Sequence, residues 1–80
     1  MNVAMPLKLC QVTTQVCSVR SAHGEHVGNL KLIGGVWKFK AIGYDASGNV
    51  LPGGGPLTER HNTTFAALDV ALINAGLALD

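Results

Sequence analysis

Two neighbouring histidines and, further along the chain, a row of lysines are the side chains best suited to bind a metal ion or an anion. His23, Glu25 and His26 place two imidazoles and a carboxylate within four residues, a set that can bind a divalent metal weakly. The sequence offers no further ligand cluster at zinc spacing, although His61 could approach in space. We therefore expect solvated loop histidines, with no metal and no other cofactor.

A glycine-rich loop, PGGGP at residues 52–56, precedes Arg60, His61 and a predicted helix. Free backbone amides and a helix N-terminus at this point would favour an anion. The Lys-Ser/Thr pair of a nucleotide-binding P-loop is missing, so we interpret the loop as a structural turn. Arg60 and His61 remain candidate binding residues, in a ligand-binding or catalytic site at a dimer seam.

The candidate acids and bases are scattered along the chain. They are Asp45, Glu59, Arg60, His61 and Asp69. Their spacing pairs neither a nucleophile with a base nor two carboxylates with each other. We therefore expect no enzymatic activity and assign no catalytic residue.

Lys31, Lys38 and Lys40 belong to the stretch from Gly28 to Tyr44, whose alternating pattern predicts a β-hairpin. Gly34-Gly35 sits at its centre as a two-residue turn free to adopt positive φ. With this turn, Lys31 faces Lys38 across the strands, and Lys40 extends the row. Like charges directly opposite each other cost a little stability, which invites an anionic partner. One hypothesis is a nucleic-acid-binding regulator that uses this face. The alternative is that the lysines merely block unwanted strand pairing.

The same register places Ile33, Val36 and Ile42 on the lysine face and the remaining apolar residues of the two strands on the opposite face. These core residues are Leu30, Leu32, Trp37, Phe39 and Ala41. Because Trp37 and Phe39 point inward, the lysine face lacks the aromatic side chains on which single-strand binders stack bases.

The segments on either side of the hairpin are less clearly patterned. Residues 9–20 favour a strand with a bulge near Val16, because Val, Thr and Cys dominate, but a helix remains open. Residues 1–6 are expected to form a flexible arm. After a turn at residues 45–49, Val50-Leu51 predicts a short strand, and residues 52–61 form a long loop, either mobile or held by its own contacts.

A C-terminal helix is predicted from about Thr63 to Gly76, with N-caps offered by Asn62-Thr63-Thr64 and a stop at the glycine. One apolar stripe, comprising Phe65, Leu68, Leu72 and Ala75, should cover the sheet. A second stripe is left over, and one sheet cannot bury both stripes. We therefore predict a homodimer or higher oligomer whose interface includes Ala66, Val70, Ile73 and Leu77.

The composition bounds the class of protein. The chain has 80 residues, of which 48% are hydrophobic and 14% charged, with a net charge of +1. These values fit one small domain. The elements predicted along the chain make it an α+β domain, an antiparallel β-meander of three to four strands with one C-terminal helix packed on one face. Its core should contain the hairpin's apolar residues with Phe65, Leu68 and Leu72.

The leading functional hypothesis is a small, bacterial-type, non-enzymatic binding or adaptor module that acts through protein contacts and self-association. The net charge is too small for the strongly basic balance of most nucleic-acid binders, so that hypothesis comes second. No apolar run approaches the roughly 18 residues of a membrane span, and Cys10 and Cys17 are interpreted as reduced thiols. We therefore expect a cytoplasmic protein.

Overall fold

The computed structural model describes residues 6–78. The predicted arm at residues 1–6 therefore lies outside the described residues except for Pro6, which is exposed. Within the described range, the chain forms an antiparallel sheet of six strands, one short 3-10 helix and one α-helix. In chain order these are β1 (Lys8–Thr13), β2 (Val16–Arg20), β3 (His26–Ile33), β4 (Val36–Tyr44), β5 (Val50–Pro52), η1 (Thr58–Arg60), β6 (Thr64–Phe65) and α1 (Val70–Leu77).

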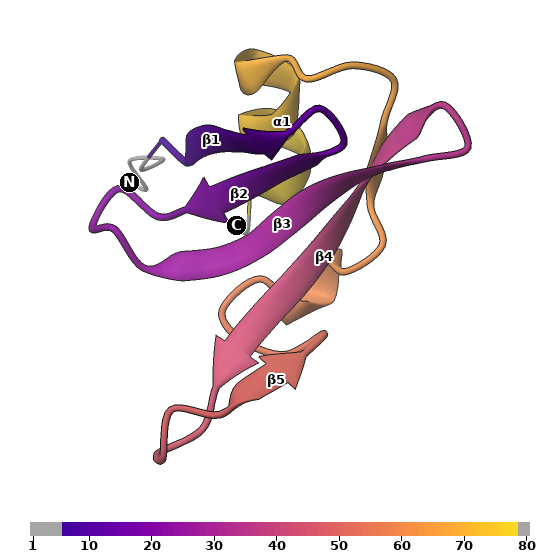
Figure 1. Cartoon of the computed structure of the whole chain (residues 1–80). Helices are drawn as coiled ribbons and strands as arrows, with labels where there is room; N and C mark the ends of the chain where they lie inside the picture. The colour runs from indigo at the N-terminus through magenta and orange to yellow at the C-terminus, as the bar shows by residue number, and fades with distance from the viewer. Residues whose placement is uncertain (1–5, 79–80) are drawn as a thin grey trace.

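The sheet is a meander in the order β1-β2-β3-β4-β5, and α1 lies behind β1 and β2 in the view of Figure 1. Two short strands pair with the outer edge of β4: β5 pairs with Ile42–Tyr44, and β6 pairs with Trp37 and Lys38. The α+β meander with one C-terminal helix is therefore confirmed, with more strands than the three to four expected.

The β3–β4 hairpin has the predicted register. Ile33 pairs with Val36, and Lys31 pairs with Lys38. Gly34 and Gly35 form the turn with φ of 58° and 83°, values that glycine reaches without a steric penalty. The alternation of side chains around this turn was therefore sufficient to define the centre of the sheet.

Residues 9–20 do not form the single bulged strand that we expected, and the helical alternative is also wrong. The chain reverses at Thr14-Gln15 and gives the separate strands β1 and β2. The turn is supported by the Thr13 hydroxyl, which accepts a hydrogen bond from the Gln15 backbone N–H at 3.1 Å. A shift of register does occur, but between Gln11 and Thr13 rather than near Val16.

The C-terminal helix begins later than predicted. Thr64 and Phe65 pair with the free edge of β4, and the helix starts after Asp69, whose carboxylate accepts from the Leu72 N–H at 3.0 Å. Gly76 lies inside the helix and does not end it. Its lack of a side chain admits the Phe65 ring, since a Cβ there would lie 2.6 Å from Cε1 of that ring.

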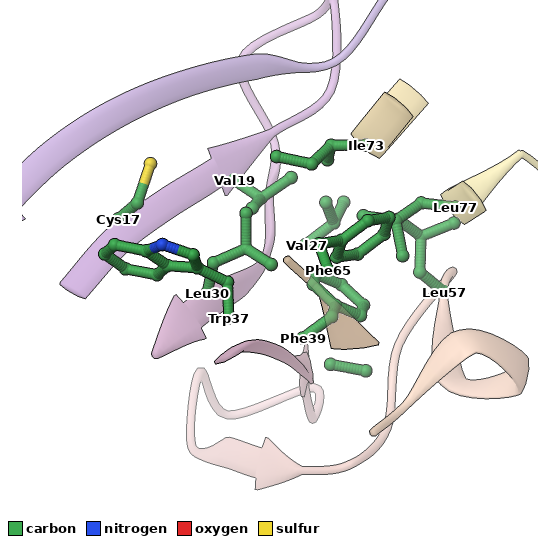
Figure 2. Packing of buried hydrophobic residues seen from close by; sticks show 11 residues of the cluster. Cys17, Val19, Val27, Leu30, Trp37, Phe39, Leu57, Phe65, Ile73 and Leu77 are labelled. Carbon is green, nitrogen blue, oxygen red and sulfur yellow. The ribbon is translucent and has the colours of Figure 1, made fainter. Parts of the chain in front are cut away.

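The core lies between the sheet and α1, where Ile73 and Leu77 point from the helix toward Val19, Val27 and Phe65 (Figure 2). Leu30, Trp37, Phe39 and Ala41 are buried there as predicted. The expected core positions of Leu32 and Leu72 are wrong, because their side chains are 36% and 58% exposed, and Leu68 is only partly buried. Leu32 lies near the tip of the hairpin. The inward positions of α1 are Ile73 and Leu77, which leaves Leu72 on the outer side of the helix.

Candidate functional site

The sheet face opposite α1 gathers nearly all the positive charge of the chain. The pairing register places five of the six Lys and Arg residues on this surface, which we call the basic face: Lys8, Arg20, Lys31, Lys38 and Lys40. Strands β1 to β5 contain no Asp or Glu at all. A small net charge therefore conceals a strongly one-sided distribution.

The three predicted lysines lie together at the centre of the basic face. Lys31 is directly opposite Lys38, and Lys40 is directly opposite Asn29. The Lys40 ammonium donates to the side-chain oxygen of Asn62 at 2.7 Å, which is a neutral partner. Directly opposed residues have Cβ atoms about 4.5 to 5.5 Å apart, so the positive charges of Lys31 and Lys38 act on each other.

The carboxylate closest in sequence to the lysines is engaged elsewhere. Asp45 accepts from the backbone N–H groups of Ser47 and Asn49 at 2.9 Å and from the Asn49 amide at 3.1 Å. These hydrogen bonds, those from Asn49 foremost, hold the pKa of Asp45 below its usual value. Asp45 therefore serves its own turn and does not neutralise the basic face.

Sequence reasoning missed the far end of the basic face. Lys8 is opposite Arg20, so a second like-charge pair lies at the β1–β2 edge. Both basic residues are visible in the sequence, but their pairing follows only when residues 9–20 are divided into two strands.

His26 also belongs to the basic face, because it pairs with Arg20 on β2. Its imidazole contacts the Tyr44 hydroxyl and the Asn29 side-chain oxygen, each at 3.1 Å. The contact between the His26 ring and the Asn29 side-chain oxygen orients the Asn29 amide. The NH₂ group of Asn29 is then able to donate to a ligand.

A shallow depression of about 380 Å³ lies on the basic face where β3, β4 and β5 meet. Asn29, Lys31 and Lys40 form its polar side. Its apolar wall consists of side chains from the β4–β5 pair, namely Ile42, Val50 and Pro52, and His61 lines it as well. The depression thus combines positive charge, an amide, an imidazole and an apolar surface.

His61 is held in place by the backbone of β4. Between the parts of its edge that pair with β5 and β6, β4 presents the Ala41 N–H, which donates to Nδ1 of His61 at 3.0 Å. That nitrogen is therefore the acceptor, and Nε2 carries the proton of the neutral ring. Because the imidazole replaces a strand neighbour, its orientation is set before any ligand arrives.

Arg60 does not join His61 in one site. Its Nε and Nη2 atoms both donate to the carbonyl of Ala78, at 3.1 and 2.6 Å, just after α1. A cation at a helix C-terminus satisfies free carbonyls and complements the helix dipole. The guanidinium thus has a structural partner, on the helix side of the sheet.

The glycine-rich loop is held by its own contacts. The Thr58 hydroxyl donates to the Gly53 carbonyl at 2.6 Å, and the Gly53 N–H donates to the Ala41 carbonyl at 2.8 Å. Gly43 and Gly55 pack backbone against backbone, since a Cβ on Gly43 would lie 2.5 Å from the Gly55 nitrogen. Glycine at these positions is therefore required for close packing.

Other candidate chemistry is dispersed. Among residues 6–78, no three His, Cys, Asp or Glu side chains are grouped so that they could hold a metal ion. Cys10 and Cys17 are free thiols; Cys10 is exposed and Cys17 is buried, and burial raises the Cys17 pKa. In the part of the chain that is described, no helix is long and apolar enough to cross a membrane.

Only two of the four residues predicted at an oligomer interface are exposed. Ile73 and Leu77 are fully buried in the core, so placing them at an interface was wrong. Ala66 and Val70 are exposed. The apolar outer face of α1 is instead formed by Val70, Ala71, Leu72 and Ala75.

Comparisons of the chain with protein families, with curated proteins and with solved structures found no match.

Proposed function

We propose that the protein binds nucleic acid through the phosphate backbone, with the basic face as the contact surface. The observation that carries this proposal is the segregation of charge: five of six basic side chains share a sheet face whose strands contain no carboxylate. Lys31 and Lys38 face each other without an acidic neighbour in the strands. An array of phosphates relieves the repulsion within such a row.

The number of lysines bounds the strength of binding. Three central lysines that each neutralise one phosphate of a single strand give a slope of log K against log salt of about −2, at about 0.7 per phosphate. Binding of this kind is moderate, depends strongly on salt and tolerates any sequence. The protein then acts as a non-enzymatic binding module.

Fluorescence anisotropy of a labelled oligonucleotide, measured across a series of salt concentrations, tests the proposal. The wild type should bind at low salt and weaken linearly with log salt. Lys31→Gln should weaken binding and reduce the slope by about 0.7, the share of one phosphate of a single strand. Ala67→Glu is the matched control, because it lowers the net charge by the same unit at an exposed position between β6 and α1.

Two results would contradict the proposal. The first is unchanged anisotropy at the lowest salt. The second is an equal loss of affinity in Lys31→Gln and Ala67→Glu, because net charge rather than the basic face would then govern binding.

Self-association is a second candidate function, and the outer face of α1 supports it. Val70 and Leu72 are 55% and 58% exposed, and no residue from Val70 to Leu77 carries a charge. An uncharged apolar patch can meet a copy of itself about a two-fold axis without repulsion. In this view the protein is a dimeric adaptor, and its free thiols favour the cytoplasm.

Light scattering after size exclusion tests this second candidate. A dimer would have twice the chain mass of 8.3 kDa, and Leu72→Glu should convert it to the monomer. A wild-type mass of one chain at micromolar concentration would reject self-association and leave the basic face untouched.

A further inference from the structure

The depression on the basic face is the feature that the phosphate contacts of the proposed function leave unused. Its volume of about 380 Å³ falls within the range of about 300 to 1,000 Å³ that is typical of ligand pockets. It is partly open to solvent, and Lys31 and Lys40 belong both to the row of lysines and to its lining. A ligand that follows the lysines therefore passes its mouth.

We infer that this depression takes one unpaired nucleobase, which makes the ligand single-stranded nucleic acid rather than a duplex. This inference rests on the proposed binding of phosphates by the basic face. Phosphates on Lys31 and Lys38 leave the adjoining base within reach of the depression. A base in a duplex is stacked and paired, so it cannot enter.

The lining matches the two surfaces of a base. The apolar wall of Ile42, Val50 and Pro52 can cover its flat face, and the His61 ring is one of the aromatic groups on which proteins stack bases. The Asn29 NH₂ group and the Lys40 ammonium are donors at the polar side, where they can meet acceptors at the edge of the base. Purely anionic small molecules would leave the apolar wall uncovered.

The site is organised in advance. The Ala41 N–H fixes the His61 ring, the contact to His26 orients Asn29, and Ile42 pairs directly with Pro52 in the β4–β5 ladder. Binding of a base then orders few side chains, which reduces the entropic cost of association.

A strand without bases supplies the decisive comparison. A short oligothymidylate and an abasic strand of the same length carry the same phosphates, so they differ only in the presence of bases. The wild type should bind the oligothymidylate at least about fivefold more tightly, the lower limit expected for stacking of one base. Val50→Ser removes part of the apolar wall at an exposed position and should lower the affinity for the oligothymidylate to that for the abasic strand.

Each outcome of the comparison has a distinct meaning. Equal affinity of the wild type for the two strands overturns the base site and leaves the proposed function standing. Absence of binding to either strand overturns both. A preference that persists in Val50→Ser places the base elsewhere and also overturns the inference.

A second measurement does not depend on the folding of a variant. On titration of the wild type with thymidine monophosphate, the amide resonances of Ile42 and Gly53 and the ring resonances of His61 should move. With inorganic phosphate they should stay in place. Equal shifts with both compounds would show a phosphate site alone and would contradict the inference.

Discussion

Replacing Lys31 by Glu should stabilise the fold and weaken nucleic-acid binding at the same time. Lys31 lies directly opposite Lys38, and its neighbour on the other strand is Val16. The substitution turns a repulsive pair into an attractive one. Cross-strand charge pairs and exposed ion pairs contribute up to about 1 kcal/mol, so we expect a gain of about 0.5 to 1 kcal/mol.

For a domain of this size, such a gain raises the melting temperature by roughly 2 to 8 °C. The gain should shrink as salt screens the pair. Lys31→Gln removes the repulsion without adding an attraction, and its effect should be smaller. The double variant Lys31→Glu, Lys38→Glu restores a like-charge pair, so it should lose the gain; with the single variant Lys38→Glu it completes a double-mutant cycle.

Thermal melts at low and high salt measure the stability, and anisotropy with a labelled oligonucleotide measures binding in the same buffers. The expected result is opposite signs: a higher melting temperature with lower affinity. A lower melting temperature in Lys31→Glu would refute the assignment of unrelieved repulsion to this pair. Higher stability with unchanged affinity would show that Lys31 takes no part in nucleic-acid binding.

Three further predictions concern the rest of the fold. Gly76→Ala should destabilise the protein by about 1 to 3 kcal/mol, because the new Cβ meets the Phe65 ring, although alanine normally stabilises a helix interior; a higher midpoint in urea would contradict that packing. Thiol labelling should modify Cys10 in the native state and Cys17, which is buried and has a raised pKa, only on unfolding; equal rates would show that Cys17 is accessible. In an NMR titration, the pKa of the Asp45 carboxyl in the folded protein should lie below its usual value. Its stabilising effect is therefore present above the pKa of the unfolded chain and is lost as the pH falls through the lowered pKa of the folded state. An ordinary pKa would disprove the hydrogen bonds of this turn.

The sequence predicted most where structure is local. Alternation around Gly34-Gly35 fixed the β3–β4 register because both strands and their turn lie in one continuous stretch. The β1–β2 hairpin was not predicted, because its turn at Thr14-Gln15 has none of the usual turn residues and relies on the Thr13 hydroxyl. The start of the helix was misplaced because Phe65 is drawn into a strand by the distant edge of β4.

In the candidate site too, only the local features could be predicted from the sequence. The central lysines could be placed on one face from the hairpin register alone. The depression could not, because it depends on the return of the chain through η1, which brings His61 against Ala41. Nor could Arg60 be assigned, since its partner at Ala78 is known only when the end of α1 is placed.

NMR mapping of the contact surface is the decisive measurement for nucleic-acid binding by the basic face. Amide shifts are followed as a short single-stranded oligonucleotide is added to the protein at low salt. The basic face predicts that Lys31, Lys38 and Lys40 shift together, that residues of α1 stay in place, and that added salt reverses the change. Shifts confined to α1, or no shifts at all, would contradict the assignment of nucleic-acid binding to the basic face.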